Sequence, residues 1–501
     1  DVGSRNGTFV NDNPVSQKEL ENGDVVKFGE IQMRFAGPGK SKTSSTRVIA
    51  SVDPDKTTIT MPAAKGLPAW AFGLIGFAAV AIIFAGLYLT GLLGGKDDNG
   101  AEAAELQDAR IWSVELGHKD PSTPLLADIN NDGFLDVMVA TIEGVAFAID
   151  GEEGKRIFEA NVSGRVLAPP VAGDLTGDGV NDVIVAGTDG IVTAFNGKGR
   201  ILWQSSGDLD LGEIINRPVL SNINDDDIVD VIVPATGRGL VALDGSRGWP
   251  LWDTAELISG KTITTPLVAD LNNDGRPDFV AVTDTGQVLA VSSRQGEVWK
   301  LWEAKVPDVH YASPLFIKTE AHSLVIVATD GGGIKALNAE NGDAVWSASI
   351  NKRFFASPLG SDANGNGFSD VVLVAENGDI HVLDGQNGEE IWSGKAGAEI
   401  NASPALMDLN NNGLADLILL DKSGRMHVRN ITDGQEMLNV KLSQDAGFSA
   451  SPLLGDINND ELLNIITVDE NGLLAVIGLN RPLPKGKALW PVFLGNDMHG
   501  L

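Results

Sequence analysis

The sequence predicts an all-β protein whose largest part is an eight-bladed β-propeller, accompanied by one transmembrane helix and a partial β-sandwich. The first observation is a repeat that begins near residue 110, with each unit opened by a proline. The second is that each unit holds four strand-like segments, which makes one blade. The third is a content of 59 glycines, which supplies the turns that such a fold needs. The opening prolines lie 44 to 48 residues apart, at Pro124, Pro170, Pro218, Pro266, Pro314, Pro358, Pro404 and Pro452.

Within each unit the strands follow a common order. A short apolar strand follows the proline, and an Asp/Asn/Gly loop leads to a β-branched strand such as residues 182–186. A glycine turn leads to a third strand, and a second glycine turn leads to a fourth. The fourth strand carries a bulky apolar residue four positions after its glycine, as in Gly154 with Phe158, Gly199 with Trp203, Gly248 with Trp252, Gly342 with Trp346 and Gly388 with Trp392. Because this residue recurs once per blade, we predict that it docks each blade on its neighbour and does not form a ligand cage.

Two similar segments flank the repeats, IWSVELG around Trp112 and LWPVFLG around Trp490. We expect one of them to complete a blade that begins at the other end of the chain, because such closure removes exposed sheet edges. The sequence leaves open which segment does so.

The Asp/Asn loops have the spacing of a calcium site. Calcium prefers six to eight oxygen ligands, and oxygens at loop positions 1, 3, 5, 7 (a backbone carbonyl) and 9 supply most of them. Glycine at position 6 permits the sharp turn. Three loops fit this pattern, with one Thr at a third position, and we predict metal ligands at Asp128, Asn130, Asp132, Phe134, Asp136, Asp174, Thr176, Asp178, Val180, Asp182, Asp270, Asn272, Asp274, Arg276 and Asp278.

Two further loops have Asn at position 5, and their predicted ligands are Asp362, Asn364, Asn366, Asp370, Asp408, Asn410, Asn412 and Asp416. Unit three has Asp227, and unit eight Glu461, where glycine is expected, and unit five has no such loop. The alternative is that Asp and Asn only cap tight turns. We predict Ca²⁺ over Mg²⁺, with a dissociation constant of roughly 10⁻⁴–10⁻³ M, as in extracellular modules.

These repeats resemble two known families. The Asp-x-Asn-x-Asp-Gly loops before β-branched strands are similar to FG-GAP/VCBS repeats, as in integrin-type propellers. The Ala-Leu-Asp segments followed by Gly-x-x-x-Trp are similar to pyrroloquinoline-quinone-like (PQQ-like) repeats. The resemblance covers about 390 residues. It implies a propeller, calcium at the loops, and protein recognition or scaffolding.

Residues 69–93 form a stretch without a charged side chain, and this stretch is long enough to cross a bilayer. We predict a transmembrane helix over residues 67–95, between a flexible linker at 38–66 and a second linker at 96–109. Lysines and arginines precede the segment, whereas acidic residues follow it. The positive-inside rule then gives a single-pass protein of the cell (inner) membrane, with a cytoplasmic N-terminus and a periplasmic or extracellular propeller at 110–501.

Residues 1–37 resemble the C-terminal half of a forkhead-associated (FHA) domain. The stretch Ser4–Asn11 (SRNGTFVN) and the stretch Leu20–Gly29 (LENGDVVKFG) follow the order of that family's motifs. FHA domains are β-sandwiches that bind phosphothreonine peptides, so the resemblance implies phosphopeptide contacts by Ser4, Arg5 and Asn6. The family's Gly-Arg and Ser-x-x-His motifs would lie before residue 1, and we do not expect this half to bind phosphopeptide alone.

Composition argues against several other functions. The chain has no cysteine, which excludes thiolate metal sites and cysteine nucleophiles. Its net charge is −31, mostly carried by residues 96–501, so nucleic acid is not an expected partner. The six histidines are scattered without metal-site spacing. We therefore predict a non-enzyme. A quinoprotein dehydrogenase with PQQ-like repeats is the enzymatic alternative, but those enzymes commonly carry a vicinal cysteine pair.

Two functions remain open. In the first, the propeller binds a protein or glycan outside the membrane while the FHA domain recruits phosphothreonine proteins inside. In the second, the protein is a structural scaffold or adhesin of the envelope, and the FHA domain only localises it. A fold does not choose between them.

Overall fold

The computed structural model describes residues 109–308, 311–410 and 412–482, together with six short strands nearer the N-terminus. The chain divides into two compact units, Asp1–Asp97 and Asp98–Leu501. The predicted transmembrane helix at 67–95 lies outside the described residues. Among those that are described, no helix has the length and apolarity needed to cross a membrane.

In the first unit the described strands form one six-stranded antiparallel sheet in the order β2-β1-β3-β4-β5-β6. Two of these strands lie at 49–52 and 57–60, inside the stretch for which the sequence predicts a flexible linker. Isoleucine, valine and threonine dominate both segments, and β-branched residues favour strands even where no alternation is visible. The strands are β1 (Thr8–Val10), β2 (Asn13–Pro14), β3 (Val25–Phe28), β4 (Ile31–Arg34), β5 (Ile49–Val52) and β6 (Thr57–Thr60).

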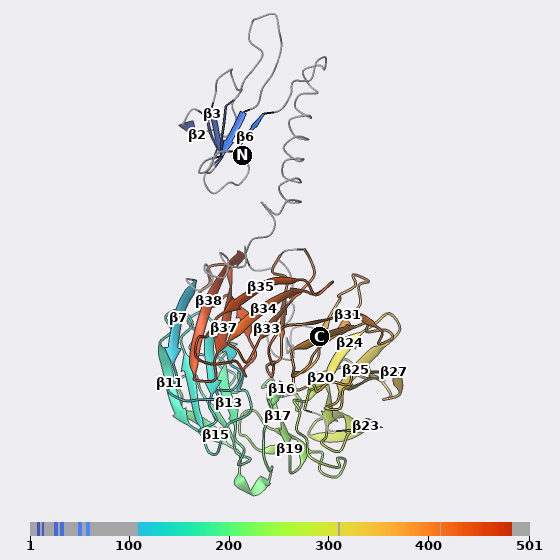
Figure 1. Ribbon diagram of the computed structural model, residues 1–501. Helices are drawn as coiled ribbons and strands as arrows, with labels where there is room; N and C mark the ends of the chain where they lie inside the picture. Colours follow the sequence, from blue (N-terminus) through green and yellow to red (C-terminus); the bar gives the residue numbers. More distant parts are fainter. Residues whose placement is uncertain are drawn as a thin grey trace, which may run out of the picture. The chain divides into compact units, whose positions relative to one another are not determined.

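The second unit is the predicted propeller, with eight four-stranded antiparallel sheets (Figure 1). Seven of the proline-opened repeats form all four strands of a blade. The last repeat forms only the first three strands of its blade. The first four blades contain β8 (Leu125–Ala127), β9 (Asp136–Ala140), β10 (Val145–Ile149), β11 (Arg156–Asn161); β12 (Val171–Gly173), β13 (Asp182–Ala186), β14 (Val192–Phe195), β15 (Ile201–Gln204); β16 (Val219–Ser221), β17 (Asp230–Ala235), β18 (Gly239–Leu243), β19 (Pro250–Asp253); β20 (Leu267–Ala269), β21 (Asp278–Val282), β22 (Gln287–Arg294) and β23 (Glu297–Lys305).

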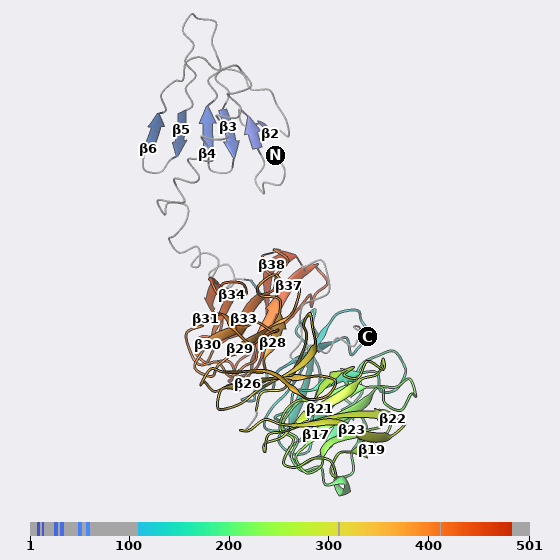
Figure 2. The ribbon, with the colours of Figure 1, turned by 90° about the vertical axis from the view of Figure 1, so that its right-hand side faces the viewer.

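The remaining blades repeat this order (Figure 2). A 3₁₀ turn, η1 (Gly207–Leu209), follows the outer strand of the second blade. The strands are β24 (Leu315–Lys318), β25 (Ser323–Ala328), β26 (Gly333–Asn338), β27 (Ala344–Ser349); β28 (Leu359–Ser361), β29 (Asp370–Val374), β30 (Asp379–Leu383), β31 (Glu390–Lys395); β32 (Ala405–Met407), β33 (Asp416–Leu420), β34 (Arg425–Asn430), β35 (Glu436–Lys441); β36 (Leu453–Gly455), β37 (Leu462–Val468) and β38 (Leu473–Pro482).

The N-terminal segment closes the propeller. Strand β7 (Arg110–Glu115) pairs with β38 and forms the outer strand of the last blade. The segment around Trp112 therefore performs the closure, and the similar segment around Trp490 lies outside the described residues. Ser451 N–H also donates to Thr123 Oγ1 at 3.1 Å, which joins the last blade to the first. Closure leaves each blade with neighbours on both sides.

The blades pack through apolar clusters that each combine residues from two neighbouring sheets. In one cluster Ile184 of β13 packs with Val231 of β17, and both side chains are fully buried. The middle strands are continuous buried runs, such as Asp136–Ala140 and Val145–Ile149. This burial on both faces explains why those strands read as uninterrupted apolar runs in the sequence.

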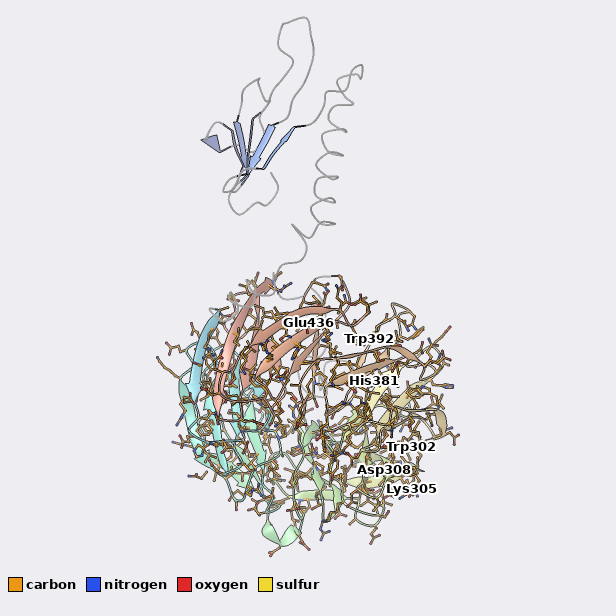
Figure 3. All side chains as sticks on the ribbon, in the orientation of Figure 1. Trp302, Lys305, Asp308, His381, Trp392 and Glu436 are labelled. Carbon is orange, nitrogen blue, oxygen red and sulfur yellow. The ribbon has the colours of Figure 1, made fainter. Side chains whose placement is uncertain are left out.

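A recurring tryptophan docks five of the blades on the next one, as the sequence predicts, whereas the buried Nε1 of Trp252 has no hydrogen-bond partner among the described residues. Trp346 Nε1 donates to Gly385 O of the following blade at 2.9 Å. Trp302 and Trp392, labelled in Figure 3, make the same bond to Ala339 O and Ile431 O. The same hydrogen bond joins Trp112 to Gly151 O and Trp203 to Gly245 O.

The glycine of the Gly-x-x-x-Trp repeat contacts the preceding blade, whereas the tryptophan contacts the following blade. A Cβ on Gly388 would lie 2.5 Å from Trp346 Cε3, and Gly388 has a φ of +76°. Only glycine fits this place, because the indole of the preceding blade occupies the space of a side chain. The same approach recurs where Gly154, Gly248, Gly342 and Gly434 meet the tryptophan of the preceding blade, and Gly199 meets Phe158 in the same way.

Replacing Trp346 by Ala should destabilise the propeller by about 3–5 kcal/mol, because the change empties a buried inter-blade contact. Urea unfolding followed by circular dichroism measures the difference. Trp249→Ala is the matched control, because Trp249 is 65% exposed, and its effect should stay within about 0.5 kcal/mol. Equal losses from both changes would contradict the docking role.

Candidate metal-binding loops

The Asp/Asn loops connect the first and second strands of the blades, and their backbone is left-handed at two positions. In the first loop Asn131 at position 4 has a φ of 59°, and Gly133 at position 6 has a φ of 89°. Asn and Gly tolerate this conformation best, which explains their places in the sequence. Asp227 and Glu461 adopt the same conformation in units three and eight, with φ of 66° and 64°. The loop shape is thus kept where the glycine is lost.

The first and fifth positions bind the loop's own backbone. Asp128 accepts hydrogen bonds from Asn131 N–H at 2.7 Å and Gly133 N–H at 3.0 Å. Asp132 accepts one from Phe134 N–H at 2.9 Å. The same bonds recur at Asp174, Asp178, Asp270, Asp274, Asp362, Asn366, Asp408 and Asn412. This is the turn-capping alternative that the sequence leaves open, and it leaves lone pairs on these oxygens for a cation.

The ninth position joins the loop to the rest of the blade. Asp136 is completely buried, and its Oδ2 accepts from Ile129 N–H at 3.1 Å while its Oδ1 accepts from Gly151 N–H at 3.4 Å. Gly151 belongs to the turn between the third and fourth strands, so one carboxylate ties two turns together. The bond from the second loop position recurs at Asp182, Asp230, Asp278, Asp370, Asp416 and Asn464.

Burial and neighbouring charge disfavour the ionised form of these carboxyl groups. Burial raises the pKa of Asp136 to about 6, and the charges of Asp132 and Asp150 add to the rise, against the backbone hydrogen bond from Ile129. The pKa of Asp182, Asp230 and Asp416 is likewise raised to about 6, chiefly by burial. A nearby cation would reverse this effect, since it favours the charged carboxylate.

One group of acidic side chains stands close enough to share an ion. Among the residues that the structure describes, Asp132, Asp136 and Asp150 hold carboxylate oxygens within 4.8 Å of one another. Two of them are predicted ligands at positions 5 and 9, whereas Asp128 at position 1 lies outside the group. The third, Asp150, follows β10 and is not among the predicted ligands. The recurrence of this aspartate as Asp244 and Asp384 is the sequence signal that identifies it.

Several position-3 amides face the buried carboxylate. Asn410 Nδ2 donates to Asp416 Oδ1 at 3.1 Å, and Asn272 and Asn364 do the same to Asp278 and Asp370 at 3.4 Å. Thr176 has no amide, and its hydroxyl donates to Asp174. At Phe134, Val180 and Arg276, whose carbonyls are predicted ligands, the backbone N–H donates to position 5.

The predicted phosphopeptide residues Ser4, Arg5 and Asn6 lie outside the described residues.

Comparison with known proteins places the chain among PQQ-like propellers. The profile of a family described as outer membrane protein assembly factor BamB matches residues 101–315 and 284–490. An FHA domain profile matches residues 1–29. FG-GAP/VCBS repeats, the other resemblance of the sequence, are not shown by these matches. No curated protein matches the chain.

Solved structures share the fold at low sequence identity. BamB from Moraxella catarrhalis is 16% identical, with a TM-score of 0.52 over 74% of this chain and 96% of that one. Quinohemoprotein alcohol dehydrogenase from Comamonas testosteroni is 12% identical, with a TM-score of 0.57 over 77% and 78%. The computationally designed protein Ika8 is 16% identical, with a TM-score of 0.51 over 74% and 99%. At these identities the likeness concerns the fold alone.

The raised pKa values predict a pH dependence in the absence of divalent cations. Between the unfolded pKa of about 3.9 and the folded pKa of about 6, the folded chain holds more protons at Asp136. Its contribution to stability is therefore present at lower pH and is lost as pH rises through this window. Asp136→Asn removes the titrating group and keeps the shape, as Asn464 does naturally in the last blade.

In EDTA, the melting temperature of Asp136→Asn relative to the unmodified chain should therefore increase from pH 4.5 to pH 7. Thermal melts at both pH values measure this difference. Thr432→Ser, in the exposed turn that precedes β35, removes no titrating group, so it is the control and should give a difference that does not change with pH. A constant difference for Asp136→Asn would show that its carboxyl group titrates normally.

Proposed function

The chain belongs to the family of PQQ-like repeat propellers described as outer membrane protein assembly factor BamB, and on this premise we propose that it is a membrane-anchored binding protein and not an enzyme. The observation that carries the proposal is the buried aspartate at the ninth loop position. It fixes the exposed loops to a closed ring of blades, and a rigid frame that presents polar loops is suited to recognition. The ligand of the propeller is a protein or a glycan.

The remaining parts of the chain supply the anchor and a second binding function. The uncharged segment at 69–93 is long enough to span a bilayer, and the flanking charges favour a cytoplasmic N-terminus. The propeller then lies in the periplasm or outside the cell. The FHA match at residues 1–29 supports phosphothreonine recognition on the cytoplasmic side. In this arrangement one molecule binds partners on both sides of the membrane.

We further propose that the loops bind Ca²⁺. The fit is best in the first blade, where Asp132, Asp136 and Asp150 provide three carboxylates for one ion. Asn130 and the carbonyl of Phe134 complete the oxygen set that calcium prefers. The equivalent residues of the other four loops follow the same plan with fewer acidic groups. When bound, the ion neutralises carboxylates that otherwise repel one another, and it thereby stabilises the face that carries the loops.

Calcium should raise the thermal stability of the protein at neutral pH. Addition of about 5 mM Ca²⁺ to the EDTA-treated chain should raise its melting temperature, because this concentration exceeds the expected dissociation constant. Magnesium at the same concentration should have a smaller effect. Asp132→Asn/Asp150→Asn should reduce the calcium-dependent rise, whereas Asp330→Asn, which removes a partly exposed partner of Arg353, should not. An identical melting curve with EDTA and with Ca²⁺ would eliminate the metal proposal.

A partner of the propeller should be recoverable from the envelope fraction of the source cells. Affinity capture on the propeller, with and without Ca²⁺, should retain a specific protein or glycan in a calcium-dependent manner. The alternative function as a structural scaffold or adhesin predicts retention of many envelope components without calcium dependence. The likeness to quinohemoprotein alcohol dehydrogenase extends only to the fold, so no catalytic function is proposed from it.

A further inference from the structure

Three carboxylates of the first blade, Asp132, Asp136 and Asp150, form an acidic cluster beside the seam of the ring. The seam is the pairing of β7 with β38, which brings the first and the last described strand of the propeller into one sheet. Asp132 and Asp136 belong to the loop that connects β8 with β9, whereas Asp150 belongs to the turn between β10 and β11. Segments from both sides of the seam contact this loop and this turn.

From the C-terminal side of the seam, an amide of the last blade holds the loop that carries Asp132. Asn459 lies in the loop between β36 and β37, and its Nδ2 donates to Gly133 O at 2.7 Å. Gly133 directly follows Asp132 and precedes Phe134, whose carbonyl is a predicted ligand. This hydrogen bond therefore fixes the backbone that carries two of the proposed calcium ligands.

Both sides of the seam hold the turn that carries Asp150. On the N-terminal side, Trp112 of β7 donates from its Nε1 to Gly151 O at 2.7 Å, and Gly151 follows Asp150 in sequence. On the C-terminal side, a Cβ on Gly151 would lie only 2.6 Å from Ile457 Cγ1, so the last blade packs directly against this turn. Gly151 N–H in turn donates to Asp136 Oδ1 at 3.4 Å. Two hydrogen bonds therefore connect the closing strand to the acidic cluster.

The corresponding contacts between other blades reach turns with fewer acidic groups. Asn273 has the place of Asn459 in the fourth loop, and its amide donates into the fifth blade, which has no Asp/Asn loop. Trp346 has the place of Trp112, but the loop of the sixth blade has Asn366 at position 5, where the first blade has a carboxylate. Among the described blades, the closure of the ring and an acidic cluster of three carboxylates meet only at the seam.

We propose that the acidic cluster is a calcium-dependent latch that keeps the ring closed at its seam. Without a cation the three carboxylates repel one another, and this repulsion spreads the loop and the turn that both sides of the seam contact. With calcium bound the repulsion is removed, and Gly133 and Gly151 keep the positions at which Asn459 and Trp112 reach them. By thermodynamic linkage, the closed ring also binds calcium more tightly than an open one. This inference rests on the calcium binding proposed above and adds a regulatory effect to that site.

The latch should make opening of the seam rarer. A cation that binds the closed ring and not the open ring reduces opening by a factor of one plus the ratio of its concentration to the dissociation constant. With about 5 mM Ca²⁺ and a dissociation constant of roughly 10⁻⁴–10⁻³ M, this factor is about 6 to 50. Backbone amides that pair β7 with β38 exchange their hydrogen when the seam opens, so their exchange rate reports the latch.

Hydrogen exchange of the 501-residue chain, followed by mass spectrometry at neutral pH, tests the latch. Relative to EDTA, about 5 mM Ca²⁺ should slow exchange in β7 and β38 by about 6- to 50-fold. Strands β25 and β26 of the fifth blade are the internal reference, because that blade has no Asp/Asn loop, and their exchange should change little.

A matched pair of amide variants tests the contact from the C-terminal side. Asn459→Gly removes the bond to Gly133 O, and Asn273→Gly removes the bond to Glu340. The two residues have φ of 54° and 60°, which glycine adopts without strain. Asn459→Gly should reduce the calcium-dependent slowing in β7 and β38 by at least about twofold, as expected for one lost hydrogen bond. Asn273→Gly should leave the slowing unchanged.

A second pair tests the contact from the N-terminal side. Trp112→Phe removes the hydrogen bond to Gly151 O and keeps an aromatic ring, and Trp346→Phe does the same at Gly385 O. Trp112→Phe should likewise reduce the calcium-dependent slowing in β7 and β38. Trp346→Phe acts between the fifth and sixth blades and should not reduce it.

Three results would overturn the proposal. The first is equal slowing in β7, β38 and the fifth blade, which would mean that calcium stabilises the whole propeller and not its seam. The second is a calcium effect on the seam that Asn459→Gly changes no more than Asn273→Gly does. The third is a calcium-dependent rise in melting temperature without slower exchange in β7 or β38, which would leave calcium binding intact and refute the latch alone. If neither the melting curve nor the exchange responds to calcium, the latch fails together with the metal proposal.

Discussion

The propeller depends on one recurring contact, which five of the eight blades make, the insertion of a tryptophan over a glycine of the next blade. In the Trp346 and Gly388 pair, the indole fills the space that a side chain would need and also donates a hydrogen bond to Gly385 O. Apolar burial sets the spacing between blades, and the hydrogen bond sets their register. Since most of the blades make this contact, a similar angle between neighbouring blades recurs around the ring. The positions of the Asp/Asn loops follow from this repetition.

Much of this architecture could be predicted from the sequence because the residues that begin and end its strands are determined locally. Opening prolines, loop aspartates and turn glycines recur at fixed intervals, and each reflects a backbone need within one blade. The closing strand could not be chosen, since the segments around Trp112 and Trp490 are alike and only pairing with β38 distinguishes them. The strands β5 and β6 could not be predicted from the sequence either. Their β-branched residues lie in a stretch whose Ser, Thr, Pro and Lys content is typical of a linker.

The candidate site was predictable in its spacing but not in its grouping. Sequence spacing treats the loop as an isolated unit, and it predicts Asp132 and Asp136, whose carboxylates the structure brings close together. It misses Asp150, which comes from a different turn and approaches the loop only through the bond between Gly151 and Asp136. Asp128 at position 1 is a predicted ligand that lies outside this group. Its carboxylate accepts hydrogen bonds from the backbone of its own turn. Groups that a fold brings together across a blade are invisible to a pattern read along the chain.

The closing strand also has a consequence for how the protein is made. Among the propeller strands, β7 is synthesised first, whereas its partner β38 is synthesised last. At about 5–20 residues per second, β7 waits tens of seconds for its place in the sheet. Until then the growing arc of blades has two open ends, and it cannot become a ring. The circle therefore closes only after β38 has been synthesised, and a chain that ends before β38 keeps two exposed blade edges.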